Sequence, residues 1–263
     1  MSRKQLEGLV LECTPYRERD GLVALATPEG VIRILARGIQ KETSRNRRIC
    51  LPFTRVQIET EQQGEGMHRL IHGTLLEDCG VISEDLRMQA VCLAVNEAVI
   101  RSGMPAGLYA RLEALWFSCR QKNPDWLGRA AVTAALILQA EGIAPQVDGC
   151  AICGSQSQIC SMDLESAGFL CRRHARGRPV WKPERLRRMR QAVKVPPGLE
   201  NRLDLTGFTL ADVRLLLTWY SRYGHSPLNS VRFLDLVVSM YPEPEDSTQT
   251  ESARENQKNT GNN

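Results

Sequence analysis

The chain has 263 residues, with 34 lysines and arginines against 30 aspartates and glutamates, so its formal net charge is +4. This length allows two domains. No apolar run is long enough to span a membrane and no charged-then-apolar segment opens the chain, which argues against membrane and secreted classes. We therefore expect a cytoplasmic protein with no membrane contact.

Residues 1–80 are predicted to form a domain of short strands. The apolar, β-rich segments are 6–13, 22–38, 53–62 and 67–78, and a turn at 27–30 divides the second into two strands. Val56 and Ile58 alternate with polar side chains, as expected of a strand with one buried face. Five antiparallel strands without intervening helices predict a small closed barrel, because an open sheet of this size would leave its edges exposed.

A basic segment at 36–53 separates the third strand from the fourth. It carries five basic side chains against the single acid Glu42, namely Arg37, Lys41, Arg45, Arg47 and Arg48. We interpret it as a flexible loop that projects from the barrel and binds nucleic-acid phosphates without reading sequence. The alternative is a solvated loop with scattered charges. Tyr16 and Phe53 are the only aromatic candidates for base stacking here, so electrostatics should outweigh stacking.

From about residue 84 the apolar period becomes that of helices, and a helical domain is predicted over 81–242. The expected helices span 84–103, 108–121, 126–142, 208–224 and 226–240. Ser83 and Thr206 are predicted N-caps, and Gly142 is a predicted C-terminal glycine. Residues 243–263 contain almost no apolar side chains and predict a disordered tail.

Two pairs of potential metal ligands lie between the third and fourth of these helices. Cys150 and Cys153 are followed, after seventeen residues, by Cys171 and His174. Three thiolates and an imidazole at this spacing predict one closed, structural Zn²⁺ site. Separate buried cysteines or a disulfide are the alternative, but an odd total of nine cysteines and no signal peptide favour a reducing compartment. Cys160 is expected to be a small loop or strand residue.

The most positive stretch of the chain follows this motif. Residues 172–190 carry nine basic side chains against the single acid Glu184. Four are predicted to contact nucleic acid, namely Arg172, Arg173, Arg176 and Arg178. Trp181 would be available to stack on a base. A solvated helix face is the alternative, and contact between DNA and the helix at 182–194 is left open.

The order of barrel, basic loop, helices and Cys-x-x-Cys-Gly motif resembles the RecO family of bacterial DNA-repair and recombination-mediator proteins. The resemblance covers about residues 5–240 and is carried by segments 8–30, 36–45, 51–53, 137–154 and 168–171. It implies an α+β chain with an N-terminal OB-fold, then a helical domain with a zinc-binding insertion at about 148–176. One departure is the ligand pair Cys171 and His174, where many relatives have two cysteines.

The family resemblance also implies a function. Members bind single- and double-stranded DNA, anneal complementary strands and, with RecR, load RecA onto strands covered by single-stranded-DNA-binding protein (SSB). The resemblance implies that the acidic SSB tail contacts the helical domain, where it would need an apolar groove with a basic rim. Such a protein would associate with the nucleoid.

No enzymatic activity is expected. A nuclease would need clustered carboxylates and a zinc deaminase would need a His-x-Glu motif, whereas Asp148 and Asp163 stand isolated in the sequence. The chain also lacks a Gly-rich phosphate-binding loop. The alternative function is a zinc-stabilised protein-interaction module without intrinsic DNA activity.

Overall fold

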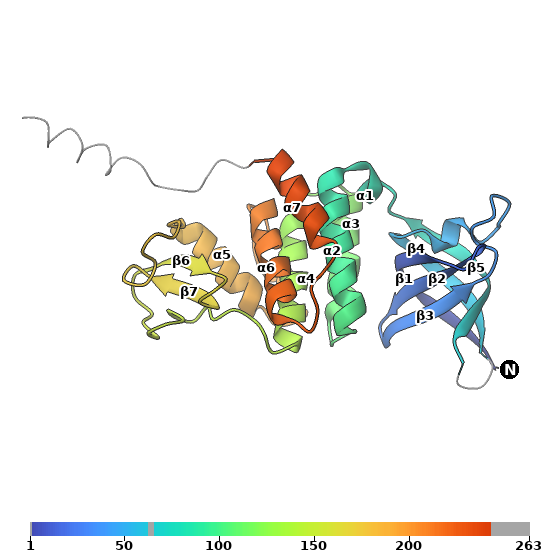
Figure 1. The fold of residues 1–263 in the computed structure, drawn as a ribbon, viewed down its shortest axis with the longest axis horizontal. Helices are drawn as coiled ribbons and strands as arrows, with labels where there is room; N and C mark the ends of the chain where they lie inside the picture. Colours follow the sequence, from blue (N-terminus) through green and yellow to red (C-terminus); the bar gives the residue numbers. More distant parts are fainter. Residues whose placement is uncertain (1, 63–65, 243–263) are drawn as a thin grey trace, which may run out of the picture.

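The computed structural model describes residues 2–62 and 66–242 (Figure 1). The molecule is elongated, with a β-barrel at one end, helices in the middle and a small module containing a β-hairpin at the other end. The predicted disordered tail, residues 243–263, lies outside the described residues. None of the described helices is both long and apolar enough to cross a membrane.

The N-terminal part is a closed five-stranded barrel, as predicted. The strands are β1 (Ser2–Tyr16), β2 (Asp20–Thr27), β3 (Gly30–Ala36), β4 (Thr54–Gln62) and β5 (His68–Asp78). Their order around the barrel is β1-β2-β3-β5-β4, and β4 returns to pair with β1. All pairings are antiparallel except a short parallel contact between β3 and β5, where Ile34 pairs with His68. This is the expected OB-fold.

Apolar side chains fill the barrel interior. Val56 and Ile58 point inward and Gln57 is exposed, which confirms the alternation predicted for this strand. Gly73 of β5 lies against this strand: a Cβ there would stand 2.6 Å from the Ile58 side chain and 2.8 Å from the Gln57 carbonyl oxygen. Glycine therefore allows β5 to pass close to β4.

The segment between β3 and β4 is a folded cap on the barrel, and the prediction of a flexible, projecting loop is wrong. The side chains of Ile39 and Ile49 are buried in the barrel core, the latter from the short 3-10 helix η1 (Arg48–Cys50). The Gly38 N–H donates a hydrogen bond to the Asp20 carboxylate at 2.8 Å. Two isolated apolar residues give no periodic pattern, so the sequence did not reveal these anchors.

The helical domain begins with four helices. They are α1 (Val81–Glu84), α2 (Leu86–Ser102), α3 (Leu108–Arg120) and α4 (Trp126–Ala140). Helix α4 is buried on more than one side, because Leu136, Ile137 and Leu138 are all buried. Strand β5 ends at Asp78 and helix α1 begins at Val81. The predicted domain boundary, at residue 80, lies between them.

Two predicted N-caps are wrong by a few residues. Ser83 lies within α1, and Asp85 caps α2 by accepting hydrogen bonds from two backbone N–H groups of its first turn. Thr206 donates its hydroxyl to Asp204, while Thr209 caps the later helix through a reciprocal capping box. Gly142 follows α4 with φ +70°, as expected of a C-terminal glycine.

Three further helices complete the domain. They are α5 (Pro183–Lys194), α6 (Leu210–Tyr223) and α7 (Val231–Met240), with the 3-10 helix η2 (Glu200–Arg202) between α5 and α6. Helix α7 starts later than predicted, because Glu97 of α2 accepts hydrogen bonds from the N–H groups of Asn229 and Ser230. These contacts hold the preceding residues outside the helix.

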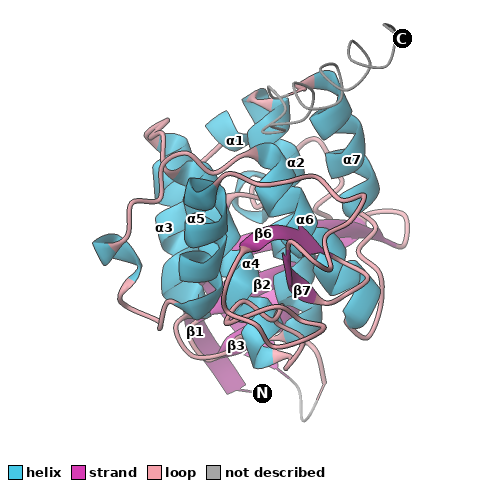
Figure 2. Ribbon diagram, turned by 90° about the vertical axis from the view of Figure 1, so that its left-hand side faces the viewer, coloured by secondary structure: helices cyan, strands magenta, loops and turns pink. Residues whose placement is uncertain are grey.

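Residues 148–176, here called the metal module, lie at the end of the molecule opposite the barrel. Their strands β6 (Ile159–Asp163) and β7 (Gly168–Cys171) form an antiparallel hairpin, and Cys160 lies in β6, as expected. Seen from this end, the hairpin stands in front of the helices and the barrel lies behind them (Figure 2). The helices therefore separate the metal module from the barrel.

Candidate metal centre and nucleic-acid interface

The four predicted metal ligands come together in the metal module. The ligand atoms of Cys150, Cys153, Cys171 and His174 all lie within 4.8 Å of one another. The sulfurs of Cys153 and Cys171 are 3.9 Å apart, and His174 Nδ1 lies 3.5 and 3.4 Å from the sulfurs of Cys150 and Cys171. Tetrahedral zinc, with bonds of about 2.3 Å to sulfur and 2.0 Å to nitrogen, requires edges of roughly 3.8 and 3.5 Å. The donor set could hold one metal ion and fits zinc.

Two tight turns position the ligands. The Gly154 N–H donates to the Cys150 carbonyl at 2.8 Å, and Gly154 adopts φ +72°, a conformation that glycine reaches without strain. The second turn is closed by the His174 N–H, which donates to the Cys171 carbonyl at 2.8 Å. Each ligand pair therefore lies on one turn, as its two-residue spacing predicts.

Backbone donors favour the thiolate form of Cys150. Burial raises the pKa of its thiol, but hydrogen bonds from the backbone of Cys171, Cys153 and Ile152, together with the His174 ring, lower it from 9.0 to about 6. The thiolate is the form of cysteine that binds metal. Cys150 is thus prepared as a ligand at neutral pH.

The neighbouring thiol shows why a cation suits this site. A hydrogen bond from the Ser155 backbone lowers the pKa of Cys153, but burial and the sulfurs of Cys150 and Cys171 outweigh it and raise the pKa. Three sulfurs at this separation repel one another when all are charged. A bound cation would remove that repulsion, so the electrostatics agree with the geometry.

The two aspartates of the module have other partners. Asp163 accepts hydrogen bonds from Ser166 and pairs with Arg178 at 3.3 Å, while Asp148 pairs with Arg190 and Lys194 at 2.9 and 2.7 Å. Four protein ligands would fill the coordination sphere of a tetrahedral ion. The arrangement is therefore that of a structural site.

The five basic residues predicted to bind nucleic acid on the barrel are all exposed. They are Arg37, Lys41, Arg45, Arg47 and Arg48. Arg48 pairs with Asp78 at 3.3 Å, and the other four form no ion pair within the described residues. Because the cap is folded, these charges are held close to the barrel surface. Phosphates could bind there at a lower entropic cost than on a mobile loop.

Sequence reasoning missed two more basic residues beside this cap. Arg17 and Arg19 are exposed in the turn between β1 and β2, and the Arg19 carbonyl accepts a hydrogen bond from the Gln40 N–H at 3.0 Å. This contact joins the turn to the basic cap. The sequence feature that could have identified them is the pair of arginines, separated by one residue, between the first two predicted strands.

Only one of the two base-stacking candidates lies on the surface. Tyr16 is 37% exposed, and the Arg17 guanidinium lies 5.2 Å from the centre of its ring. Phe53 is 2% exposed and packs against Trp116 of α3, so the suggestion that it stacks on a base is wrong. Its ring belongs to the core shared by the barrel and the helices.

Of the four basic residues predicted to bind nucleic acid near the metal ligands, three are unpaired among the described residues and one is paired with acidic side chains. Arg172, Arg173 and Arg176 are exposed and form no ion pair in the described part of the chain. Arg178 pairs with Asp163 and with Glu165, the latter at 2.9 Å. The first three are therefore free to bind phosphate, whereas Arg178 is largely neutralised.

Most basic side chains of helix α5 are paired within the protein. The pairs are Arg185 with Asp212, Arg187 with Glu184, and both Arg190 and Lys194 with Asp148. Trp181 is 8% exposed, and the Arg185 guanidinium lies 4.0 Å from the centre of its ring. The expectation that Trp181 is available for stacking is therefore wrong.

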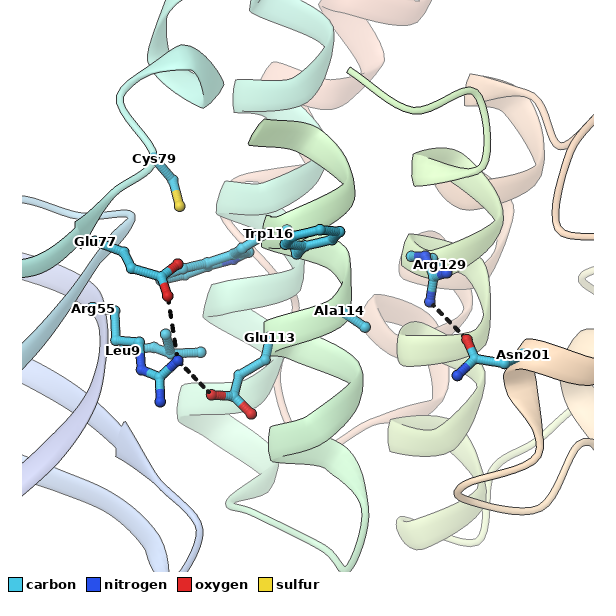
Figure 3. Close-up of a pocket in the computed structure, with 10 residues that line it drawn as sticks. Leu9, Arg55, Glu77, Cys79, Glu113, Ala114, Trp116, Arg129 and Asn201 are labelled. Carbon is cyan, nitrogen blue, oxygen red and sulfur yellow. Dashed lines mark hydrogen bonds and ion pairs between the residues drawn. The ribbon is translucent and has the colours of Figure 1, made fainter. Parts of the chain in front are cut away.

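Two adjoining hollows lie on the helical domain beside Arg129. One, of about 410 Å³, opens between the barrel and α3 and is lined by Trp116 and the exposed Phe117. The other, of about 390 Å³, is lined by Val132 and Pro197. Arg129 borders both and donates a hydrogen bond to Asn201 at 3.3 Å (Figure 3).

Comparison with known proteins agrees with this architecture. Residues 1–78, the barrel, match the family model for the Recombination protein O N terminal domain. The DNA repair protein RecO of Bacillus cytotoxicus is 26% identical over 242 residues, which cover 88% of this chain and 96% of the relative. The DNA repair protein RecO of Bacillus subtilis is 28% identical over 244 residues, with coverages of 89% and 94%. The matches extend from the barrel across the helices, so over most of its length the chain is similar to proteins named DNA repair protein RecO.

Proposed function

We propose that this protein is a non-enzymatic mediator of DNA repair and recombination. It binds single- and double-stranded DNA and anneals complementary strands. The main support is the folded basic cap on a small closed barrel, where four exposed cations have no acidic partner among the described residues. The relatives in Bacillus are named as DNA repair proteins, which agrees with such a role.

The proposed contacts are with the phosphate backbone. On the barrel they are made by Arg37, Lys41, Arg45 and Arg47, with Arg48 contributing less because Asp78 partly neutralises it. Binding through phosphates does not depend on sequence and weakens as salt rises, because each contact releases condensed counterions. Annealing requires such binding, since the bases of both strands must stay free to pair.

We propose that the metal module binds one Zn²⁺ through Cys150, Cys153, Cys171 and His174. The ligand distances support this assignment. The ion would stabilise the turns that carry the nearby exposed arginines, and it would take no part in a reaction.

The proposed protein partners are RecR and SSB, with RecA loaded onto SSB-covered strands. The SSB tail is acidic and ends in apolar residues, so it needs an apolar surface beside a positive charge. The hollow at Trp116 and Phe117 offers an apolar wall beside Arg129, and the two glutamates that also line it, Glu77 and Glu113, are paired with Arg55. Arg129 already pairs with Asp125 at 2.8 Å, so the tail carboxylates would have to compete with this contact.

The direct test is annealing of two complementary strands that are first coated with SSB, without ATP, over a range of salt. We expect the protein to accelerate annealing and the acceleration to fade as salt rises. A folded, metal-loaded protein that leaves the rate unchanged and does not bind oligonucleotides would contradict the mediator function. That result would favour a protein-interaction module instead.

A further inference from the structure

The positive charges without an acidic partner gather at the two ends of the molecule. At the barrel end of the described chain they are Arg17, Arg19, Arg33, Arg37, Lys41, Arg45 and Arg47. At the other end, in the metal module, they are Arg172, Arg173 and Arg176, again among the residues that the structure describes. The helical bundle lies between the two groups (Figures 1 and 2).

The cations of the bundle are mostly neutralised within the protein. The pairs include Arg101 with Glu97, Arg111 with Glu200, Arg120 with Glu77, Arg129 with Asp125, and Arg185 with Asp212. Within the described bundle, the arginines and lysines without a known acidic partner lie on separate segments: Lys122, Arg188, Arg202, Arg222 and Arg232. Few cations of the bundle are therefore free to carry a strand from one end of the molecule to the other.

The exposed arginines of the metal module share one tip. Arg172 and Arg173 lie between the ligands Cys171 and His174. In the first ligand turn, Ile152 occupies the position that corresponds to Arg173, and its side chain is 56% exposed. Because all ligand atoms lie within 4.8 Å of one another, the two turns face the same centre. The tip thus combines cations for phosphates with one apolar side chain for a base or sugar.

We infer that one molecule holds two nucleic-acid strands at once, one on the barrel and the other at the tip of the metal module. This inference rests on the proposed DNA binding and explains how annealing would proceed. Because most cations of the bundle between the ends are paired within the protein, the two strands bind independently. Annealing is then accelerated because both strands are held on one particle, which raises their local concentration.

The test uses two non-complementary strands of about ten nucleotides, the size of a single OB-fold site, one with a donor dye and the other with an acceptor. Energy transfer then reports strands held together without base pairing. The tip variant carries Arg172→Ala, Arg173→Ala and Arg176→Ala. The matched control carries Arg187→Ala, Arg190→Ala and Lys194→Ala, which removes as many charges, but from cations that are paired within the protein.

We expect the tip variant to lose at least about tenfold in bridging and in annealing rate, while its affinity for a single short strand changes less than about threefold, because the barrel is intact. The control should bridge within about twofold of the wild type. Metal content and thermal unfolding show whether the tip variant is folded. Should it lose metal, Arg176→Glu, outside both ligand pairs, replaces it with the same expected loss.

Three results would overturn the inference. The tip variant could bridge like the wild type, the control could lose as much as the tip variant, or the bridged particle could have the mass of two protein chains. The last result would mean that two barrels hold the strands. A wild-type protein that fails to bind even one strand would instead contradict the proposed function, so the two failures are distinguishable.

Discussion

Phe53 of the barrel packs edge-on against Trp116 of α3, with ring centroids 5.7 Å apart, and this contact joins the two domains. Phe53 ends the basic cap and adopts φ +67°, an uncommon conformation for a bulky residue. Its N–H donates to the Val10 carbonyl and its carbonyl accepts from the Cys79 N–H, both at 3.0 Å. The cap is therefore fixed from one end by the core between the domains.

Removing this ring should destabilise the whole protein. Phe53→Ala leaves a cavity at the junction, and we expect the free energy of unfolding to fall by about 3–5 kcal/mol. Phe117→Ala is the matched control, because Phe117 is 51% exposed on the same helix as Trp116 and should change stability by only about 0.5 kcal/mol. Denaturant unfolding measures both. A loss below about 1 kcal/mol for Phe53→Ala would show that the junction contributes little.

Much of the fold could be predicted because its signals are local. The alternation at Val56 and Ile58 predicted β4, and the apolar period over 126–142 predicted the helix that is observed as α4. The ligand spacing correctly predicted that Cys150 and His174 would meet. In each case neighbours in the sequence carry the physical constraint.

The charge distribution could not be predicted, because ion pairs join residues far apart in the chain. Arg185 has its partner in Asp212, and Arg190 has its partner in Asp148. The sequence therefore showed one positive run from 172 onward, whereas in the structure most of the cations from Arg178 onward are paired with acidic side chains. Phe53 was misjudged for the same reason, since its partner Trp116 lies in another domain.

Two arginines of the basic cap should set the salt dependence of DNA binding. The double variant Arg45→Ala, Arg47→Ala should bind single strands more weakly, and the slope of log affinity against log salt should become shallower by about 0.7 for each phosphate that the protein no longer neutralises. Arg48→Ala should have a smaller effect, because Arg48 pairs with Asp78. Fluorescence anisotropy over a range of salt measures both slopes. An unchanged slope for the double variant would remove the cap from the DNA-binding surface.

Tyr16 should strengthen the binding of single-stranded DNA but not that of duplex DNA. Its exposed ring can stack on an unpaired base, and such stacking contributes about 1–3 kcal/mol. We expect Tyr16→Ala to weaken single-strand binding, with little change for duplex, and Tyr16→Phe to retain it. Tyr241→Ala is a matched control, since Tyr241 is 41% exposed with the Arg87 guanidinium 5.4 Å from its ring, but lies on the helical domain. Equal losses for Tyr16→Ala on both substrates would rule out stacking.

Glu97 should make part of the stability depend on pH. Burial raises the pKa of its carboxyl, but hydrogen bonds from Ser230 and Asn229 and the charge of Arg101 outweigh it, so the pKa is lowered from 4.5. A carboxyl with a lowered pKa contributes stability above 4.5, and this contribution is lost as pH falls through its folded-state pKa.

We therefore expect Glu97→Gln to destabilise the protein by about 1–3 kcal/mol at pH 7, with the difference shrinking in acid. Thermal unfolding of both proteins from pH 7 to pH 3 measures this. A difference that stays constant over the range would mean that the ionised carboxylate is not what holds the start of α7.

The metal module should depend on its ligands for stability but not for the affinity of the barrel. Cys150→Ser and Cys171→Ser each remove a ligand, so bound zinc should fall from one ion per chain to nearly none. Metal binding is coupled to folding of the module. The free energy of unfolding should therefore fall by at least about 2 kcal/mol, which corresponds to a decrease of roughly 4–8 °C in Tm. A chelator should do the same to the wild type.

Cys160→Ser is the control, because Cys160 lies in β6 beside the ligands but outside their set. Single-strand affinity should stay within about threefold, since the barrel lies at the other end of the molecule. A full zinc content in Cys150→Ser would show that the ion is held elsewhere, and an unchanged Tm would show that the module folds without it.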